Sequence, residues 1–206
     1  MTIDSKNLLE SILDSLNRID YIKPADVPGI DLYMDQVTTF MDSQLQSSKR
    51  YEEDKILTKT MINNYAKNKL LPPPVKKKYS SEHLLLLLFI YYYKNLLSIS
   101  DIEQLLKPIT ARHFQTRDNL PLGSIYQQVF SLEHSQMERL KEDIRMKFEA
   151  SRDVFQDVDD QEREYLQLFA FISELSFDVY LKKQMIEMVI DQLREEEEPQ
   201  NPQKKK

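Results

Sequence analysis

Cationic and amide side chains that could contact a nucleic acid recur on one short predicted helix, residues 58–71. Its apolar residues Met61, Ile62 and Tyr65 have the spacing of a buried face, so the polar residues between them should point outward. Asn can read adenine through two hydrogen bonds, and Lys can contact phosphate or guanine. This face is a candidate DNA-reading surface, and an ordinary solvated helix surface is the alternative, because Asn and Lys are common on helices. The outward residues are Lys59, Thr60, Asn63, Asn64 and Lys67.

Three consecutive lysines follow this helix, after a run of three prolines. Lys76, Lys77 and Lys78 lie in a short connector, where three like charges repel each other and gain nothing from the fold itself. Residues 49–78 hold nine Lys or Arg and three acidic residues, a net charge of +6, in a chain whose net charge is −6. A basic island in an otherwise acidic chain suits one-sided contact with phosphate, and solubility is the alternative role.

The amino-acid composition argues against most kinds of catalytic, cofactor and metal site. The two glycines, Gly29 and Gly123, are too few and too far apart for a phosphate-cradling loop. The chain has no cysteine, which excludes disulfides, thiolate metal sites and cysteine nucleophiles. The histidines lack the spacing of zinc ligands, so we expect them to be packed or solvated. We therefore expect no enzyme activity, no cofactor and no metal. The histidines are His83, His113 and His134.

Two further clusters could hold a ligand, but each has a simpler structural explanation. The acidic stretch 153–164 could surround a hard cation, although a polar turn between helices is the expected structure. Aromatic residues at positions 89–93 and 169–177 could line a small-molecule pocket, although core packing is expected. The acidic residues concerned are Asp157, Asp159, Asp160, Glu162 and Glu164, and the second aromatic set is Phe169, Phe171 and Phe177.

Apolar residues recur at helical spacing along most of the chain, which predicts an all-α fold with one short wing. Thr58 is the expected N-cap of the basic helix, and prolines 72–74 stop it because their rings remove donors and fix φ. Ser100 and Glu103 match a capping box for a helix that should end before Pro108. The expected helices span about residues 4–20, 30–47, 58–71, 81–96, 100–107, 125–148 and 165–193.

Several short motifs resemble those of the MerR-type winged helix. In that family the recognition helix ends in Leu-Leu-Pro-Pro, a wing follows, and the next helix opens with Tyr-Ser-x-x-x-Leu. Here residues 70–73 read LLPP and residues 79–84 read YSSEHL, with Phe89 and Ile90 at the family spacing. Residues 98–102, SISDI, look like the following turn and helix. The resemblance implies a winged helix-turn-helix unit that binds double-stranded DNA.

The chain is also similar, through LTKTMINNY and LLPPPVKKKYS, to an uncharacterised bacterial domain-of-unknown-function family over roughly residues 25–110. It departs from the MerR pattern within the recognition helix. Asn63 and Asn64 stand where that family has Arg and Tyr, and Lys69 stands where it has a turn glycine. The wing is short and lacks the usual Gly and Arg at its tip, so the three lysines would have to substitute for them.

These patterns predict a winged helix-turn-helix-like (MerR-like) unit plus a C-terminal hairpin of long helices. The longest apolar run, residues 84–93, is about half of a membrane span, so no membrane partner is expected. The N-terminus does not resemble a signal peptide, which favours a cytoplasmic protein. The expected divisions are an N-terminal helix (1–24), the MerR-like domain (25–110), a helical dimerisation or effector region (111–194) and a disordered tail (195–206).

The function favoured by these features is a DNA-binding transcriptional regulator that uses a recognition helix and a basic wing. One such unit makes few contacts, so we expect a homodimer that binds two half-sites. The alternative is a non-enzymatic protein-interaction module built on the same fold, because fold does not fix function.

Overall fold

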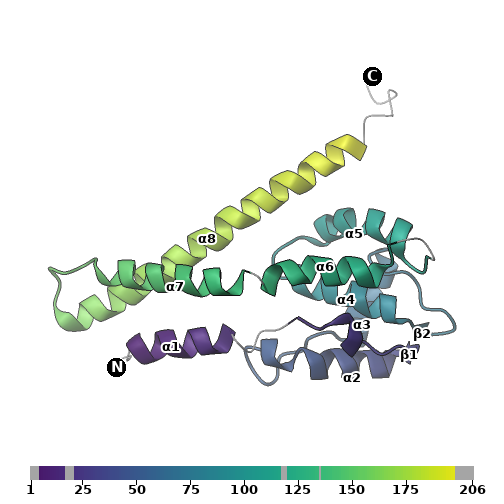
Figure 1. Ribbon diagram of the computed structural model, residues 1–206, viewed down its shortest axis with the longest axis horizontal. Helices are drawn as coiled ribbons and strands as arrows, with labels where there is room; N and C mark the ends of the chain where they lie inside the picture. The colour runs from purple at the N-terminus through teal and green to yellow at the C-terminus, as the bar shows by residue number, and fades with distance from the viewer. Residues whose placement is uncertain (1–4, 17–20, 117–119, 135, 198–206) are drawn as a thin grey trace. The chain divides into compact units, whose positions relative to one another are not determined.

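The computed structural model describes residues 5–16, 21–116, 120–134 and 136–197, and these residues are mainly helical (Figure 1). The all-α prediction is confirmed, since the described part adds one small sheet of two short strands to its helices. Contacts divide the chain into unit 1, residues 1–20 and 131–184, and unit 2, residues 21–130 and 185–206. The predicted helix end at residues 17–20 and tail residues 198–206 lie outside the described part.

Unit 2 is built around α4, Ser81–Tyr93, in which every residue from Leu84 to Ile90 is buried. A helix that is apolar on all sides must be covered on all sides. The surrounding helices supply this cover in one continuous core, in which Phe89 packs edge-on against Tyr126 with ring centroids 5.3 Å apart. The helices are α2 (Met34–Gln44), α3 (Lys59–Lys67), α5 (Ile99–His113) and the first part of α6 (Leu122–His134), with the short 3-10 helices η1 (Pro24–Asp26) and η2 (Gln46–Ser48).

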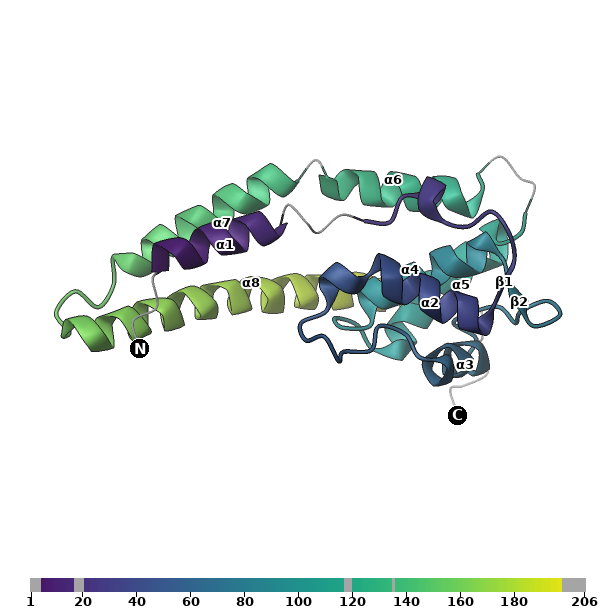
Figure 2. The same cartoon turned by 90° about the horizontal axis from the view of Figure 1, so that it is seen from below.

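The start of α2 differs from the prediction, because Leu32 and Tyr33 are extended and form strand β1. β1 pairs antiparallel with β2, Lys78–Tyr79, in the register Leu32 with Tyr79 and Tyr33 with Lys78. Pairing with a distant segment therefore overrides the local helical pattern, and the helix begins only at Met34. The two strands attach the segment after α3 to the N-terminus of α2 (Figure 2).

The boundaries of α5 also differ from the prediction. Ser98 is the N-cap and forms the capping box with Asp101, two residues earlier than the predicted pair. The helix then continues through Pro108 to His113, although an interior proline removes one hydrogen bond at a cost of about 3 kcal/mol. Leu106 is buried and Ile109 packs against the core, so burial on both sides of Pro108 offsets this cost.

The single long helix predicted over residues 125–148 is wrong. The chain forms two helices there, α6 to His134 and α7, Met137–Arg152. A period of 3.6 residues cannot reveal a short interruption when apolar residues resume on the other side of it. α7 packs with α1, Ser5–Leu16, and with the first part of α8, Asp160–Glu197, in the core of unit 1. The buried residues of that core are Leu9, Leu13, Ile144, Phe148 and Phe171.

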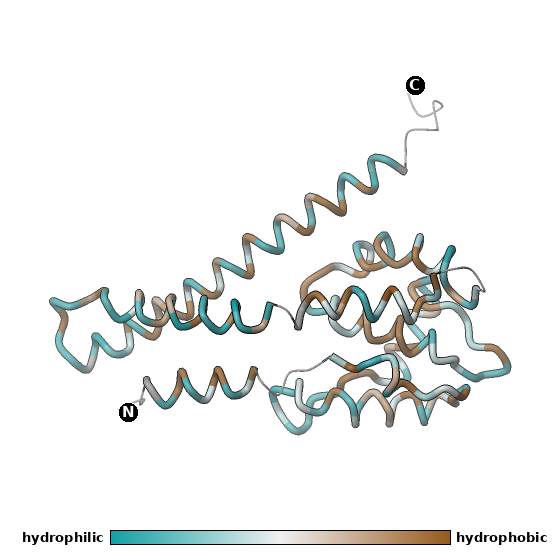
Figure 3. Tube along the Cα trace, in the orientation of Figure 1, coloured by the Kyte–Doolittle hydropathy of each residue, from teal (hydrophilic) through white to brown (hydrophobic). Residues whose placement is uncertain are grey.

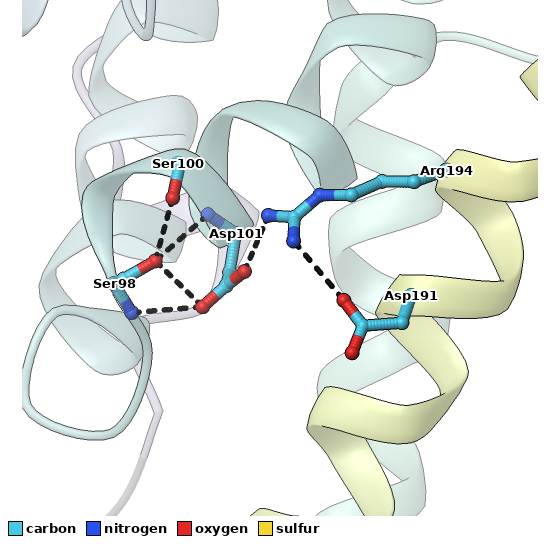
Figure 4. A network of polar contacts seen from close by, with 5 residues as sticks. All are labelled: Ser98, Ser100, Asp101, Asp191 and Arg194. Atoms are coloured by element: carbon cyan, nitrogen blue, oxygen red, sulfur yellow. Dashed lines mark hydrogen bonds and ion pairs between the residues drawn. The ribbon is translucent and has the colours of Figure 1, made fainter. Parts of the chain in front are cut away.

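The last turns of α8 pack in unit 2 through a network of polar contacts (Figure 4). Arg194 donates to Asp101 at 2.5 Å and to Asp191 at 3.1 Å, and Ile190 is buried in the core. Asp101 also accepts hydrogen bonds from the backbone N–H and the hydroxyl of Ser98, at 3.2 and 2.6 Å. The hydrogen bond from the Ser98 side chain, aided by that from Arg194, lowers the pKa of Asp101 although partial burial opposes this.

Candidate nucleic-acid interface

The structure places the predicted outward residues of α3 together on one exposed face. Ile62 and Tyr65 are buried, Met61 is half-buried, and Thr58 caps the helix by accepting the Met61 backbone N–H at 3.2 Å. Every residue of the predicted set is exposed, so each side chain is accessible to a partner. The set is Lys59, Thr60, Asn63, Asn64 and Lys67.

Lys59 differs from the rest of this face because its ammonium group forms an ion pair with Asp35 at the start of α2. Both side chains are exposed, and an exposed pair of this kind contributes little stability, about 0–1 kcal/mol. A phosphate could therefore replace Asp35 at little cost. Lys59 also lines an open cleft of about 580 Å³, together with residues of α2, Gln46 of η2 and the segment 55–58.

The connector that carries the lysines is a tight β-hairpin. The backbone N–H and carbonyl groups of Val75 and Lys78 bond to each other, at 3.1 and 2.9 Å, so Lys76 and Lys77 are the two loop residues. Their φ angles are 49° and 64°, which places both in the left-handed region. A two-residue hairpin loop with two positive φ angles is a type I′ turn, for which Asn-Gly is the strongly preferred sequence.

Lysine is an unfavourable residue at both loop positions. Its Cβ crowds the following carbonyl in the left-handed region, at a cost of about 1–2 kcal/mol per residue. Lys76 and Lys77 are both exposed, and the hairpin extends from the body of unit 2 (Figure 2). Within the described part of the chain, the ammonium groups of Lys76 and Lys77 form no ion pair or hydrogen bond. No polar contact there therefore compensates for this cost.

Lys78 has a different environment from its two neighbours. It belongs to β2, is half-buried, and holds its ammonium group 5.1 Å from the centroid of the Tyr33 ring across the sheet. This cation–π contact stabilises the strand pair by about 0.5–1 kcal/mol at a partly exposed site. The three lysines are therefore two exposed loop cations and one cation that is packed into the sheet.

Lys69 is a third lysine in the left-handed region, and the sequence patterns do not identify it as a site residue. Its φ is 60°, and it follows the C-cap of α3 in a Schellman motif. In this motif the Leu70 N–H bonds to the Tyr65 carbonyl at 2.9 Å and the Lys69 N–H to the Ala66 carbonyl at 3.2 Å. The replacement of the usual turn glycine by lysine was the available signal in the sequence.

His83 anchors the base of the hairpin from the first turn of α4. It is buried, its Nδ1 accepts the Ser80 backbone N–H at 3.0 Å, and its ring packs edge-on against Tyr79 and Phe114. Burial lowers the pKa of His83, although the carbonyl groups of Pro72 and Pro73 and the charge of Asp31 act in the opposite direction. The neutral ring therefore helps to fix β2 on α4, as expected for a packed histidine.

The acidic stretch 153–164 and the aromatic clusters were the other candidate ligand sites in the sequence. In the described ranges, no group of three or more acidic or histidine side chains is arranged to hold a metal ion. The core-packing prediction holds for Phe171 but is wrong for Phe169 and Phe177, which are 56% and 65% exposed. Across the described part, no helix combines the length and apolar content that a membrane span needs.

Comparison with protein families matches residues 22–142 to the family described as Domain of unknown function (DUF1836). The match includes β1, α2, α3, the hairpin, α4 and α5, and thus every residue of the candidate interface. Neither the curated proteins nor the solved structures gave a match. The interface must therefore be interpreted from its own chemistry.

Proposed function

We propose that this chain, which belongs to the family described as Domain of unknown function (DUF1836), is a DNA-binding transcriptional regulator with a winged helix-turn-helix unit in residues 25–110. In this proposal α3 enters the major groove, where Asn63 and Asn64 contact base edges and Lys67 contacts phosphate. The hairpin acts as the wing, and its loop lysines contact the backbone beside the groove.

The observation that carries this proposal is the pair of lysines in the type I′ loop. The hairpin would be more stable with Asn-Gly at positions 76 and 77, so stability does not explain Lys76 and Lys77. Strained residues of this kind are typical of functional sites. A phosphate partner explains both the charge and its placement at the tip of an exposed loop.

The order β1, α2, α3, hairpin, α4 supports the MerR-like assignment, although the connection between the first two helices is unusual. Residues 45–58 join α2 to α3, whereas a helix-turn-helix commonly uses a turn of three or four residues. The longer connection includes η2, and Ile56 and Leu57 within it are buried. Core packing, rather than a tight turn, thus fixes the angle at which α3 is presented.

A regulator of this type would act in the cytoplasm as a homodimer on double-stranded DNA, because specific recognition needs two half-sites. Residues 111–194 would supply dimerisation or effector response. The second candidate function is a non-enzymatic protein-interaction module on the same fold. It is favoured by the exposed apolar side chains of α8, which include Phe169, Phe177 and Leu181.

The test is recovery of genomic DNA fragments by the full chain at about 0.1 M salt, followed by sequencing. The variant Lys76→Glu/Lys77→Glu should lose the enriched fragments. A matched control, Lys23→Glu/Lys107→Glu, makes the same charge change at two exposed positions outside α3, the hairpin and residues 111–194, and should keep them. Enrichment of a shared palindrome by the wild type and the control supports the regulator, and no enrichment by the wild type refutes it.

A further inference from the structure

An exposed apolar stripe runs along the part of α8 that belongs to unit 1. Tyr165, Ile172 and Val179 are seven residues apart, and each is more than half exposed. Phe169 and Ser176, both exposed, lie between them at alternating steps of four and three residues. Figure 3 shows hydrophobic segments recurring along this helix. Alternating steps of three and four residues are the spacing of a helix seam that packs against another helix.

The stripe lies beside the face that α8 already uses within unit 1. That inner face carries Phe171, whose ring packs edge-on against Phe148 at 5.3 Å, and Asp178, which pairs with Lys147 of α7. At 3.6 residues per turn, Ile172 and Phe171 point about 100° apart on the helix. The stripe is therefore a second helix-packing surface, and no helix of the described part of unit 1 covers it.

The centre of the stripe has the shape that receives a side chain from a facing helix. Ile172, Leu175, Ser176 and Val179 line an open, mainly apolar cleft of about 360 Å³. These residues are at positions i, i+3, i+4 and i+7, which form the four corners of a hole in knobs-into-holes packing. Ser176, at one of these four positions, has a small side chain and therefore permits close approach of a second helix.

We propose that the occupant of this hole is α8 of a second copy of this chain. The stripe supplies the knobs that the hole requires, because Tyr165, Phe169 and Val179 are apolar and project from the same side. A surface that carries both knobs and holes is self-complementary, as an interface between identical subunits must be. Tyr165 and Phe169 are 67% and 56% exposed, so each has roughly 100–150 Å² left to bury out of a total of about 150–250 Å². Both copies supply this area together with Ile172 and Val179, so the stripe forms a substantial part of a dimer interface. This inference deepens the proposed function, because it names the surface that joins the two DNA-binding units.

The experiment uses the absence of cysteine from the chain. Single variants Phe169→Cys, Ile172→Cys, Ser176→Cys and Val179→Cys of the full chain are oxidised at micromolar concentration and separated without reductant. A disulfide between copies requires Cβ atoms about 3.5–4.5 Å apart, so at least one of these positions should form a covalent dimer. Leu181→Cys is the matched control, since Leu181 is exposed on the opposite side of α8 and should stay monomeric on oxidation.

Sedimentation of the unmodified chain without DNA gives an independent result. The wild type should be dimeric, and Ile172→Glu/Val179→Glu should raise the dimer dissociation constant by at least about tenfold, because a buried unpaired carboxylate is costly. Phe177→Glu/Leu181→Glu should leave the constant unchanged. A monomeric wild type, or cross-linking at Leu181→Cys alone, overturns the inference. A dimer that binds no DNA refutes the proposed function alone, and a monomer that binds DNA refutes this inference alone.

Discussion

Replacement of the hairpin loop by its preferred sequence should stabilise the protein while it weakens DNA binding. The variant Lys76→Asn/Lys77→Gly puts Asn-Gly into a turn whose φ angles, 49° and 64°, already suit it. Relief of crowding gains about 1–2 kcal/mol per left-handed residue, and the added freedom of glycine in the unfolded chain returns about 0.5–1 kcal/mol. Since Asn relieves only part of the crowding, we expect a net gain of about 1 kcal/mol, or a melting temperature about 2–4 °C higher.

The same variant should lose affinity in a manner that depends on salt. Each phosphate contact contributes about 0.9 to the slope of log K against log salt concentration, so the loss of two contacts should reduce that slope by about 1.8. At 0.1 M salt this corresponds to a loss of affinity on the order of tenfold to a hundredfold. Thermal unfolding by circular dichroism and fluorescence anisotropy with duplex DNA measure the two effects on the same sample.

Two outcomes would refute the reasoning behind this prediction. An unchanged or lower melting temperature would show that Lys76 and Lys77 are not strained in solution, which removes the observation that carries the proposed function. A higher melting temperature with unchanged affinity and slope would show that the lysines are strained but do not contact phosphate. The second outcome would leave α3 as the sole candidate contact surface.

Three further perturbations test separate parts of the structure, and urea unfolding measures each of them. Lys69→Gly should stabilise the protein by about 1 kcal/mol, because glycine is the preferred residue after the C-cap; a loss of stability would contradict the Schellman geometry. Burial lowers the pKa of His83, so the folded chain binds fewer protons than the unfolded chain. The part of the free energy of unfolding that depends on His83 is therefore fully present above the unfolded pKa of about 6.5, and it decreases as the pH falls below that value. His83→Gln should flatten that decline, and an unchanged profile would exclude His83 as its source. Arg194→Ala should destabilise the protein by about 1 kcal/mol, a low value because the guanidinium group is partly exposed. Arg194→Lys should recover part of the lost stability if the charge matters. An unaltered urea midpoint for Arg194→Ala would show that the hydrogen bonds from Ser98 are enough to stabilise Asp101.

The start and the buried face of α3 could be predicted from the sequence, but its end could not. Thr58 has the side chain of an N-cap and fills that position. The predicted end at residue 71 is wrong, because α3 ends at Lys67 and a Schellman motif at Lys69 stops it before the prolines at 72–74. The outward face of α3 follows from the spacing of Ile62 and Tyr65, which are buried. These predictions succeed because each rests on residues within one turn of the feature that they determine.

Features that depend on distant contacts could not be predicted in this way. β1 is only two residues long and exists because Leu32 pairs with Tyr79, a partner far away in the sequence. α5 continues through Pro108 because its neighbours are buried in a core that local patterns do not reveal. The exposure of Phe169 depends on which face of α8 meets α7, and helical spacing alone cannot select between two apolar faces of one helix.

The hairpin loop shows how the rarity of glycine must be separated from the choice of lysine. Neither Gly29 nor Gly123 has a positive φ, and Gln115 and Phe155 also occupy the left-handed region, so this chain accepts other residues there. The absence of Asn-Gly from this loop therefore fits the rest of the chain and has no functional meaning by itself, but it does not explain why both loop residues are lysine. Asparagine would relieve much of the crowding without glycine and without charge.

The variant Lys76→Asn/Lys77→Asn therefore isolates the charge from the glycine. It should be more stable than the wild type, and it should bind DNA as weakly as Lys76→Asn/Lys77→Gly, because both lack the same two cations. If its affinity instead matches the wild type, the ammonium groups are dispensable and the loop serves only as a spacer. The basic hairpin would then give no reason to prefer a nucleic acid over a protein partner, and the exposed face of α8 would become the stronger guide to function.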